Sequence, residues 1–558
     1  MTRLKIPVGV SDFEKIRQNG YYYVDKSPLI SALLNSESTE VTLITRPRRF
    51  GKTMAMSMLA SFFDIRKNNG PLFEGLSISR QTELCQNWMN QWPTVFFTFK
   101  DVDGLSFRDA YDMLAALTAF LFQQYDFLLA SERVTEYDKT AFRRIVYPEV
   151  SLAEIKTSFL LLTRMLHIHY GKPVILLMDE YDVPVSKASS NGYYQEMLNV
   201  VKAILSTALK DNPSLKFAVI IGCLKITKES IFTGTNNFVS DSISSNRLDE
   251  YFGFTETDVT EILQDTGLSK HMTAIKTWYD GYHFGNMEVY CSWDVMNYVR
   301  DLQNDPKAAP AGYWKNTSDN AIIRSFIDYA GNSITKKLET LLSGQAIIQK
   351  VEENLTYDYL HASEENLWSV LYLTGYLTKA VSDPPMESSD EGKSALVIPN
   401  AEIREIFETT IKTWFDDNVR LWNRKELFHA VWIGDCDTAA AEMNRLLRKT
   451  ISYHDYKEDF YHAFFAGIFA GAGYVVESNK EHGEDRSDVI VYAPSEGQAA
   501  VFEIKYSKDV ESLSKDCNAA LRQIDTRMYA KELEDDYDQV LCYGISFFKK
   551  RCVIRKKS

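Results

Sequence analysis

Runs of apolar residues without polar alternation recur through the N-terminal part of the chain. They cover residues 41–44, 94–100, 174–178 and 217–222. Continuous apolar runs of this length are typical of strands that are covered on both faces, as in a parallel sheet. Helical patterns separate the runs, over residues 54–63, 107–130, 152–169 and 193–208. Strands that alternate with helices predict an α/β fold with a parallel, doubly wound sheet.

The pattern changes twice further along the chain. A helical stretch at 256–264 is expected to begin a small lid, and the middle region is mainly helical with one strand pair, at 377–381 and 395–399. Near the C-terminus, a helix and the apolar runs at 474–477, 487–492 and 500–506 predict a separate α/β domain. The predicted domains are residues 1–290, which include an N-terminal arm and the lid, residues 291–440, and residues 441–558.

A loop rich in arginine connects the first apolar run to the first core helix. It reads R-P-R-R-F-G-K-T over residues 46–53. A helix N-terminus offers unpaired N–H groups to a phosphate, Lys52 can reach the β and γ phosphates, and the Thr53 hydroxyl can bind Mg²⁺. The usual pattern, G-x-x-x-x-G-K-[ST], has glycine where this chain has Arg46, so a stiffer and more cationic loop is expected. The predicted triphosphate-binding residues are Arg48, Arg49, Phe50, Gly51, Lys52 and Thr53.

Two acidic residues follow the third apolar run. Ligands of parallel sheets gather at the carboxyl ends of strands, so Asp179 can hold Mg²⁺ while Glu180 polarises an attacking water. Acidic residues at a strand end are also common as plain solvation, but the phosphate loop upstream favours a catalytic role. Beyond the next apolar run, Lys225 is placed to sense the γ-phosphate, with a solvated loop as the alternative. The sequence therefore predicts a P-loop NTPase core that uses ATP and Mg²⁺, with Thr53 and Asp179 as metal ligands.

Composition narrows the classes of protein. A chain of 558 residues with 45% hydrophobic content suggests about three or four globular domains. The formal net charge of −14 means that any contact with nucleic acid must come from a local basic patch. Seven scattered cysteines without a C-x-x-C pair favour reduced thiols, and no secretory signal is visible. The longest nearly apolar stretch, 464–476, is shorter than the ~20 residues of a membrane span, so we expect a cytoplasmic protein without a membrane partner.

Charged residues reappear on the apolar strands near the C-terminus. Glu503 and Lys505 lie two residues apart, so both side chains leave the same face, where Asp488 of the neighbouring strand can meet them. Two carboxylates make an oxygen-rich Mg²⁺ site, and Lys505 can orient the water that attacks a phosphodiester. Edge strands carry such charges routinely, so a structural charge ladder is the alternative. The predicted catalytic set is Asp488, Glu503, Lys505 and Gln523, with Asp488 and Glu503 as metal ligands.

These motifs together resemble a known family. The segments 46–53 and 178–182, the opening I-P-V-G and Y-V-D-K at 23–26, and G-C-L-K-I-T-K-E-S-I-F at 222–232 resemble the bacterial AAA-ATPase-like family. The C-terminal part, from 478 through F-E-I-K at 502–505 to Y-G-I-S-F at 543–547, is similar to the PD-(D/E)xK nuclease superfamily. The resemblance implies an intracellular bacterial ATP-binding protein whose C-terminal domain has a restriction-endonuclease-like fold. It supplies no substrate.

Three functions fit these motifs. The first is an ATPase coupled to a metal-dependent nuclease that acts on DNA or RNA. The second is a nucleotide-dependent switch or scaffold, whose nuclease fold binds nucleic acid or protein without cutting it; the acidic charge of the chain favours this alternative. The third is a protein-remodelling ATPase. The oligomeric state stays open, and Arg247 is a candidate arginine finger.

Overall fold

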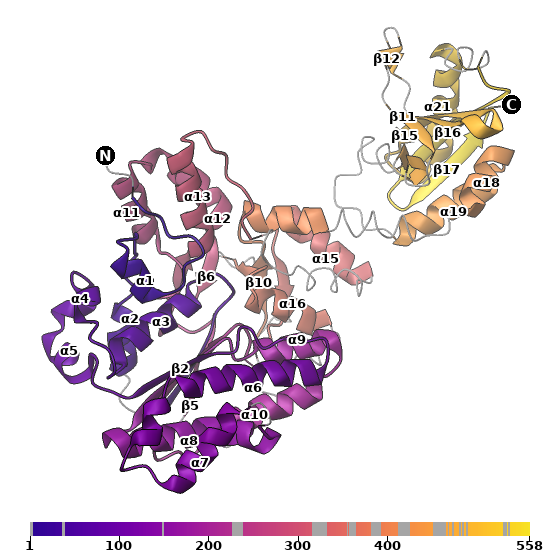
Figure 1. The fold of residues 1–558 in the computed structure, drawn as a ribbon. Coiled ribbons are helices and arrows are strands. Elements are labelled where there is room, and N and C mark those ends of the chain that lie inside the picture. The colour runs from indigo at the N-terminus through magenta and orange to yellow at the C-terminus, as the bar shows by residue number, and fades with distance from the viewer. Residues whose placement is uncertain are drawn as a thin grey trace. The chain divides into compact units, whose positions relative to one another are not determined.

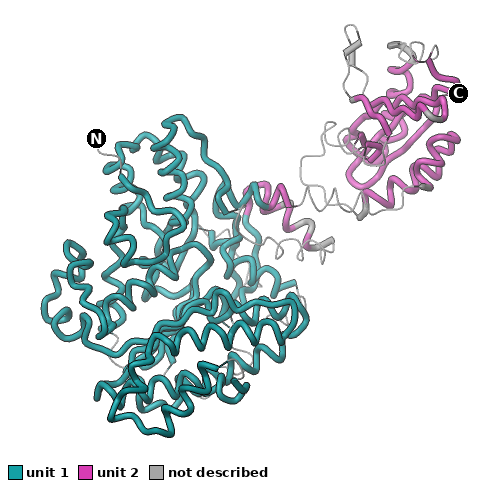
Figure 2. Tube along the Cα trace, viewed as in Figure 1, with its two compact units in different colours: residues 1–319, 346–406 teal, residues 320–345, 407–558 magenta. Residues whose placement is uncertain are grey.

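The computed structural model describes residues 4–35, 39–147, 150–225, 238–314, 332–353, 355, 364–380, 392–410, 425–449, 465–466, 468–470, 474–478, 481–482, 485–486, 489–527, 533 and 536–557. The chain forms two compact units (Figure 2). Unit 1 comprises Met1–Asp319 and Ala346–Ile406, and unit 2 comprises Asn320–Gln345 and Phe407–Ser558. The predicted middle region, residues 291–440, is shared between these units, so its status as a separate domain stays a prediction.

A five-stranded parallel sheet forms the centre of unit 1. Its order is β2-β3-β4-β1-β5, and every neighbouring pair is parallel. The strands are β2 Thr94–Thr98, β3 Val174–Asp179, β4 Leu215–Gly222, β1 Val41–Thr45 and β5 Phe238–Asp241. β1 and β3 are buried along their whole length, as continuous apolar runs predict. The predicted parallel sheet is confirmed, and β5 is an additional short edge strand.

Helices cover both faces of this sheet (Figure 1). On one side lie α1 Phe13–Gln18, α2 Pro28–Leu34 and α3 Lys52–Phe63, and on the other α6 Phe107–Gln123, α7 Glu136–Val146, α8 Leu152–Tyr170 and α10 Tyr194–Leu209. The other helices of this part are α4 Gly70–Phe73, α5 Thr82–Trp88 and α9 Val183–Asn191. α6 ends earlier than expected because Tyr125 turns inward and its hydroxyl donates to the Thr94 carbonyl at 2.8 Å. A 3₁₀ turn, Asp126–Ala130, follows it.

The expected helical lid is formed by three helices and a hairpin. These are α11 Glu256–Thr266, α12 Met272–Tyr279, α13 Ser292–Asn304, β6 Tyr282–Phe284 and β7 Met287–Val289. Buried residues of the three helices form one apolar cluster, and the N-terminal arm packs against it through Ile6, Tyr22 and Val24. The lid is therefore fixed to the chain that precedes the first strand.

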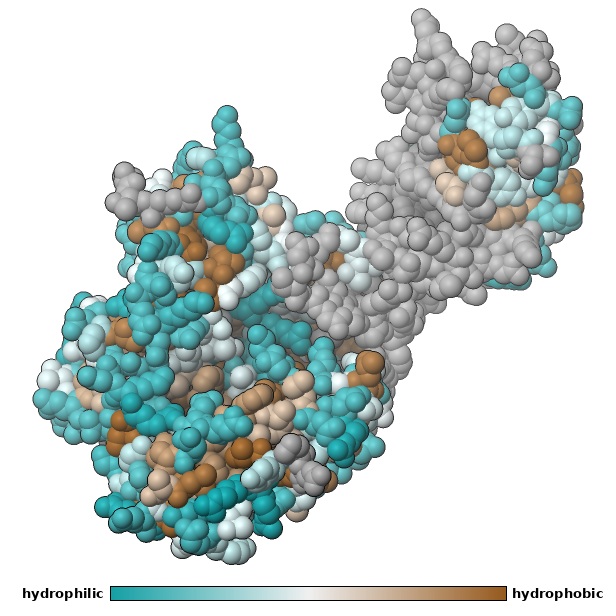
Figure 3. Space-filling view, viewed as in Figure 1, coloured by the Kyte–Doolittle hydropathy of each residue, from teal (hydrophilic) through white to brown (hydrophobic). Residues whose placement is uncertain are grey.

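The predicted strand pair of the middle region is confirmed. β9 Thr378–Lys379 and β10 Ser394–Val397 are antiparallel, and β8 Ile347–Gln349 adds a third strand on the other side of β10. α16 Glu364–Leu373 precedes β9, while α15 Asn332–Leu342 belongs to unit 2. On the face of the molecule shown in Figure 3, hydrophilic residues predominate and apolar residues form separate patches.

A second five-stranded sheet forms the core of unit 2. Its order is β11-β14-β15-β16-β17, with β15 and β16 parallel and the other pairs antiparallel. The strands are β11 Val475–Ser478, β14 Val489–Ala493, β15 Gln498–Tyr506, β16 Gln539–Phe548 and β17 Arg551–Lys556. α21 Leu513–Arg527 connects the two parallel strands, and α18 Lys425–Ile433 and α19 Cys436–Lys449 contribute to the core on the opposite face. A short ladder, β12 Glu481–His482 with β13 Asp485–Arg486, completes the described strands.

None of the helices in the described part of the chain combines the length and the apolar character needed to cross a membrane.

Candidate nucleotide and nuclease sites

The loop between β1 and α3 turns sharply at two residues. Arg49 has a φ angle of 72° and Gly51 a φ angle of 83°, both in the left-handed region. Such angles are natural for glycine but unfavourable for arginine, so the surrounding contacts must hold Arg49 in place. α3 begins at Lys52 directly after this turn, and its first N–H groups are those that a phosphate would use.

The Lys52 ammonium group lies among the ends of three core segments. It donates to the Pro47 carbonyl at 3.1 Å and to Cys223 Sγ at 3.3 Å, and it lies 3.6 Å from Glu180 Oε1. The Lys52 side chain is 3% exposed. Burial raises the pKa of the Cys223 thiol to about 11, so the thiol is neutral at pH 7. The structure thus brings Lys52 and Glu180 together, at the carboxyl ends of the strands.

Thr53 and Asp179, the two predicted metal ligands of the ATPase part, are in direct contact. Thr53 Oγ1 donates to Asp179 Oδ2 at 2.9 Å, and Thr98 at the end of β2 lies 3.5 Å from the same oxygen. Asp179 Oδ1 is buried and has no hydrogen-bond partner among the described residues. Burial, with the neighbouring Glu180 charge, raises the pKa of Asp179 to about 6. A hydroxyl and a carboxylate with an unused oxygen fit the preference of Mg²⁺ for hard oxygen ligands.

Glu180 adopts an uncommon backbone conformation directly after β3. Its φ angle is 54°, a value that costs energy in a residue with a side chain. The Glu180 side chain is 16% exposed and faces the Lys52 ammonium. Backbone strain of this kind is often found at functional sites, and here it places a carboxylate 3.6 Å from the Lys52 ammonium.

Sequence reasoning missed a clamp that holds the end of β4. Asp182 Oδ2 accepts from the backbone N–H groups of Cys223 and Leu224, both at 3.0 Å, and the Tyr181 hydroxyl donates to the Leu224 carbonyl at 2.7 Å. A Cβ at Gly222 would come within 2.5 Å of Asp182 Oδ1, so glycine is needed for this close approach. In the sequence, this clamp is indicated by the segment Glu180-Tyr181-Asp182, which directly follows β3.

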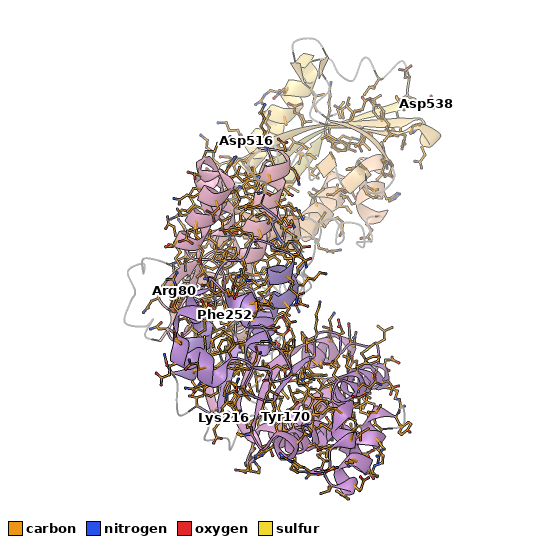
Figure 4. The ribbon with its side chains drawn as sticks, turned by 60° about the vertical axis from the view of Figure 1, so that its left-hand side comes forward. Arg80, Tyr170, Lys216, Phe252, Asp516 and Asp538 are labelled. Atoms are coloured by element: carbon orange, nitrogen blue, oxygen red, sulfur yellow. The ribbon has the colours of Figure 1, made fainter. Side chains whose placement is uncertain are left out.

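Arg46, which replaces the first glycine of the usual pattern, does not face the phosphate side of the loop. Its side chain is fully buried and donates to the carbonyls of residues 45, 241, 242 and 248 at 2.6–3.1 Å. Its guanidinium carbon also lies 5.4 Å from the ring centroids of Phe252 and Phe284; Figure 4 labels Phe252 inside unit 1. Burial lowers the pKa of Arg46 to about 10, so it stays charged at neutral pH. The expectation of a more cationic phosphate loop is corrected here, because this charge fastens the loop to the residues after β5.

The other loop residues are also attached to the lid. Arg49 NH1 donates to the Tyr313 carbonyl at 3.2 Å, and its guanidinium lies over Trp293 and Trp314. Phe50 is 1% exposed and packs against the rings of Tyr282, Phe284 and Trp314. Both side chains are thus held by aromatic partners, and their predicted contact with a phosphate stays a prediction.

Arg48 and Lys225 are the remaining predicted nucleotide-binding residues. Arg48 is the exposed arginine of the loop, and Lys225 is half-buried just beyond β4. Residues 226–237, which follow Lys225, lie outside the described part of the chain. Arg247, the candidate arginine finger, forms an ion pair with Asp241 at the end of β5. The roles of these residues stay predictions.

The N-terminal arm joins the phosphate-loop helix to the lid. The Phe13 backbone N–H donates to Ser57 Oγ of α3 at 2.9 Å. On the lid side, the Tyr22 hydroxyl donates to Asp265 at 2.8 Å and Lys26 forms an ion pair with Asp258 at 2.7 Å. These contacts give the arm a structural role; whether it also covers an adenine is not tested by them.

In unit 2, Glu503 and Lys505 leave the same face of β15, as expected from their spacing. Lys505 Nζ lies 3.7 Å from Glu503 Oε1, and the Glu503 side chain is 1% exposed. α21, which carries the half-buried Gln523, covers this face. α21 packs closely on β16 at Gly544, where an added Cβ would lie 2.6 Å from the Cys517 carbonyl oxygen. The structure therefore places Glu503 and Lys505 together beside α21.

Asp488, the other predicted carboxylate of this site, lies outside the described residues. The described pairing of β14 with β15 begins at Val489 and Phe502. Among the side chains that the structure describes, no group of three His, Cys, Asp or Glu residues gathers to hold a metal ion. The predicted metal site of Asp488 and Glu503 accordingly stays a prediction.

Comparisons with known proteins match two separate parts of the chain to two families. Residues 7–232 match the family model described as "Predicted AAA-ATPase", and residues 456–557 match that of the PD-(D/E)XK nuclease superfamily. A similar protein of Azotobacter chroococcum mcd 1, named "Uncharacterized protein in vnfD 5'region", is 23% identical over 557 residues, which is 98% of this chain and 97% of that one. The resemblance inferred from the motifs is confirmed. The chain thus combines an AAA-ATPase-like domain with a C-terminal domain of the PD-(D/E)XK nuclease superfamily.

Proposed function

We propose that this protein binds and hydrolyses ATP in unit 1 and uses the domain at its C-terminus as a metal-dependent nuclease on DNA or RNA. The observation that carries the ATPase part is the contact of Thr53 with Asp179, beside the contact of Lys52 with Glu180. Two pairs of residues, more than a hundred positions apart in the sequence, meet at one end of the sheet. This is where ligands of open parallel sheets bind.

Each of these residues has a distinct task in this proposal. Lys52 neutralises the β and γ phosphates after giving up its present contact with Cys223. Thr53 and Asp179 would hold Mg²⁺, which supplies electrostatic stabilisation of the charge that develops on the transferred phosphoryl group. Glu180 orients the attacking water. Its contact with Lys52 means that the site is neutralised internally until a triphosphate takes up the ammonium group.

The nuclease part rests on Glu503 and Lys505. Glu503 is a buried carboxylate between the apolar residues Phe502 and Ile504 of β15. Burial of a charged carboxylate costs free energy unless a partner compensates for it. Lys505 supplies one such partner and would orient the water that attacks the phosphodiester. Asp488 and Gln523 complete the proposed set, and Asp488 and Glu503 would be the ligands of a divalent metal ion.

ATP binding and hydrolysis can be tested separately. Lys52→Ala should weaken ATP binding at least tenfold, whereas Glu180→Gln should keep binding and slow hydrolysis by a factor of about 100 or more. Lys210→Ala, at an exposed lysine at the end of α10, is the matched control and should change neither. Isothermal titration with a slowly hydrolysed ATP analogue and a phosphate-release assay provide the readouts. Unchanged affinity in Lys52→Ala would overturn the phosphate-loop assignment.

Cleavage is tested on double-stranded DNA, single-stranded DNA and RNA, with and without ATP. Glu503→Gln should abolish Mg²⁺-dependent cleavage and leave binding intact, while Glu496→Gln, at an exposed glutamate next to β15, should cleave normally. Binding without any cleavage by the wild-type protein would favour the switch or scaffold function. Cleavage that persists in Glu503→Gln would refute the site.

A further inference from the structure

The last strand of the chain, β17, and the turn before it carry an unusual concentration of positive charge. Residues 549–557 read K-K-R-C-V-I-R-K-K, so six of nine residues are basic and none is acidic. The chain as a whole carries a net charge of −14. A local basic segment in an acidic protein is what recognition of a polyanion requires, because no global field attracts the ligand.

The cations lie on an edge of the sheet. β17 pairs only with β16 in the described sheet, and Cys552 and Ile554 point into the core while Arg551, Val553 and Arg555 occupy the opposite face. Residues on one face of a strand repeat every ~7 Å, so the strip from Arg551 to Lys557 extends ~20 Å. A polynucleotide strand carries one charge per ~3.4 Å of helix axis, so this length covers several phosphates.

Arg555 is held in place by neutral partners. Its guanidinium donates to Ser514 Oγ at 2.6 Å and to Asn518 Oδ1, both on α21. Within the described residues, neither Arg551 nor Arg555 forms an ion pair. A guanidinium that is oriented without being neutralised can still attract a phosphate, and the loss of side-chain entropy on binding is smaller.

The strip lies on the same face of the sheet as the proposed nuclease residues. Glu503, Gly544 and Arg555 are direct neighbours across β15, β16 and β17. Two strand spacings separate Glu503 from Arg555, which is about 10 Å. α21 covers β16 between them, and Figure 4 labels Asp516 on this helix and Asp538 at the other end of the domain. The strip and Glu503 therefore lie on one face of the sheet, with α21 packed over β16 between them.

We propose that β17 and its preceding turn are the surface that binds the phosphodiester backbone of the nucleic acid on which the C-terminal domain acts. This inference rests on the proposed nuclease function. Lysine and arginine on an edge strand also prevent edge-to-edge aggregation, and that role alone requires no ligand. The two explanations differ in their effect on binding.

The test replaces three cations and leaves the bonds of Arg555 intact. The variant Lys550→Gln/Arg551→Gln/Lys557→Gln is compared with Lys210→Gln/Lys270→Gln/Lys307→Gln, which removes the same charge from exposed sites in unit 1. Binding of the full-length protein to fluorescent duplex DNA, single-stranded DNA and RNA of equal length is measured at several salt concentrations. Size-exclusion chromatography and circular dichroism confirm that both variants are folded and equally dispersed.

We expect the β17 variant to bind at least one of these polymers tenfold or more weakly than the wild type. Its plot of log K against log salt should be less steep, by up to about 0.9 for each lost contact with duplex DNA. The control should stay within twofold of the wild type. Comparison of the polymers identifies whether DNA or RNA is the ligand. Polyglutamate is measured in the same way and tests whether the surface binds an acidic polypeptide instead.

Three results would overturn the inference: unchanged affinity and salt dependence in the β17 variant, an equal loss in the control, or a loss that affects polyglutamate alone. If the β17 variant binds normally while Glu503→Gln still abolishes cleavage, the strip is wrong and the nuclease function stands. If the wild-type protein neither binds nor cleaves nucleic acid, both are wrong.

Discussion

Restoring the usual glycine at position 46 is expected to damage the protein. Arg46→Gly would recreate the common phosphate-loop pattern, and a comparison of sequences alone would rate it as an improvement. The structure indicates the reverse, because the Arg46 guanidinium donates four hydrogen bonds to carbonyls and is fully buried. The change removes all four and leaves a cavity beside Phe252 and Phe284.

The expected loss is about 4 kcal/mol. Hydrogen bonds to a charged group contribute about 1.5–3 kcal/mol each, but the cost of burying the guanidinium offsets much of their sum. Disruption of buried charged networks generally costs about 3–5 kcal/mol, and the lost volume acts in the same direction. Arg46→Met also leaves the carbonyls unpaired, but its side chain fills the volume and no cavity forms. It should therefore be less destabilising than Arg46→Gly.

Scanning calorimetry provides the measurement. Because the chain has two units, the relevant transition is the one whose midpoint rises with Mg²⁺ and ATP, and Arg46→Gly should lower this midpoint by roughly 5 °C. Arg48→Gly makes the same change at an exposed position of the loop and should lower it by far less. The reasoning would be refuted if the unfolding midpoint of Arg46→Gly lay within 2 °C of the wild-type value, or if this variant bound ATP more tightly than the wild type.

Three further predictions follow from buried or strained groups. Because the folded pKa of Asp179 is raised to about 6, protons compete with Mg²⁺, so the affinity for Mg²⁺–ATP should rise about tenfold per pH unit below pH 6 and level off above it; Asp179→Asn should remove this dependence in titration calorimetry. Burial raises the pKa of Glu402, so this carboxyl is protonated in the folded protein, and Glu402→Gln should change the unfolding free energy by less than about 1 kcal/mol. Glu402→Leu removes the acceptor of the buried Trp314 backbone N–H and should cost about 1–3 kcal/mol. Denaturant titrations measure both changes. Gly281→Ala places a Cβ 2.2 Å from the Pro399 carbonyl at a positive φ and should cost more than about 2 kcal/mol, while Gly20→Ala, at a positive φ in open space, should cost about 1 kcal/mol; equal midpoints for these two variants in thermal melts would contradict the argument.

The parts of unit 1 that follow from short-range pattern were predictable. Continuous apolar runs identify β1 and β3, and the rule that ligands gather at the carboxyl ends of parallel strands brings Thr53 to Asp179 without any coordinates. The same reasoning on alternate residues places Glu503 and Lys505 on one face of β15.

The remainder depends on partners that are distant in sequence. Arg46 was expected to make the phosphate loop more cationic, yet its guanidinium is bound by carbonyls some 200 positions away, which no local pattern encodes. The clamp formed by Asp182 likewise depends on the exact end of β4. Edge strands such as β5 are short and only partly buried, so their apolar signal is weak.

The attachment of the phosphate loop has a mechanical consequence. The Gly253 N–H donates to the Phe50 carbonyl at 3.0 Å, and Ser292 Oγ at the start of α13 donates to the Arg49 carbonyl at the same distance. The loop therefore shares a backbone hydrogen bond with Gly253, shortly before α11, and a side-chain hydrogen bond with the start of α13. We expect that a phosphate that shifts the turn at Gly51 also displaces the start of α13, so that the lid responds to occupancy of the nucleotide site.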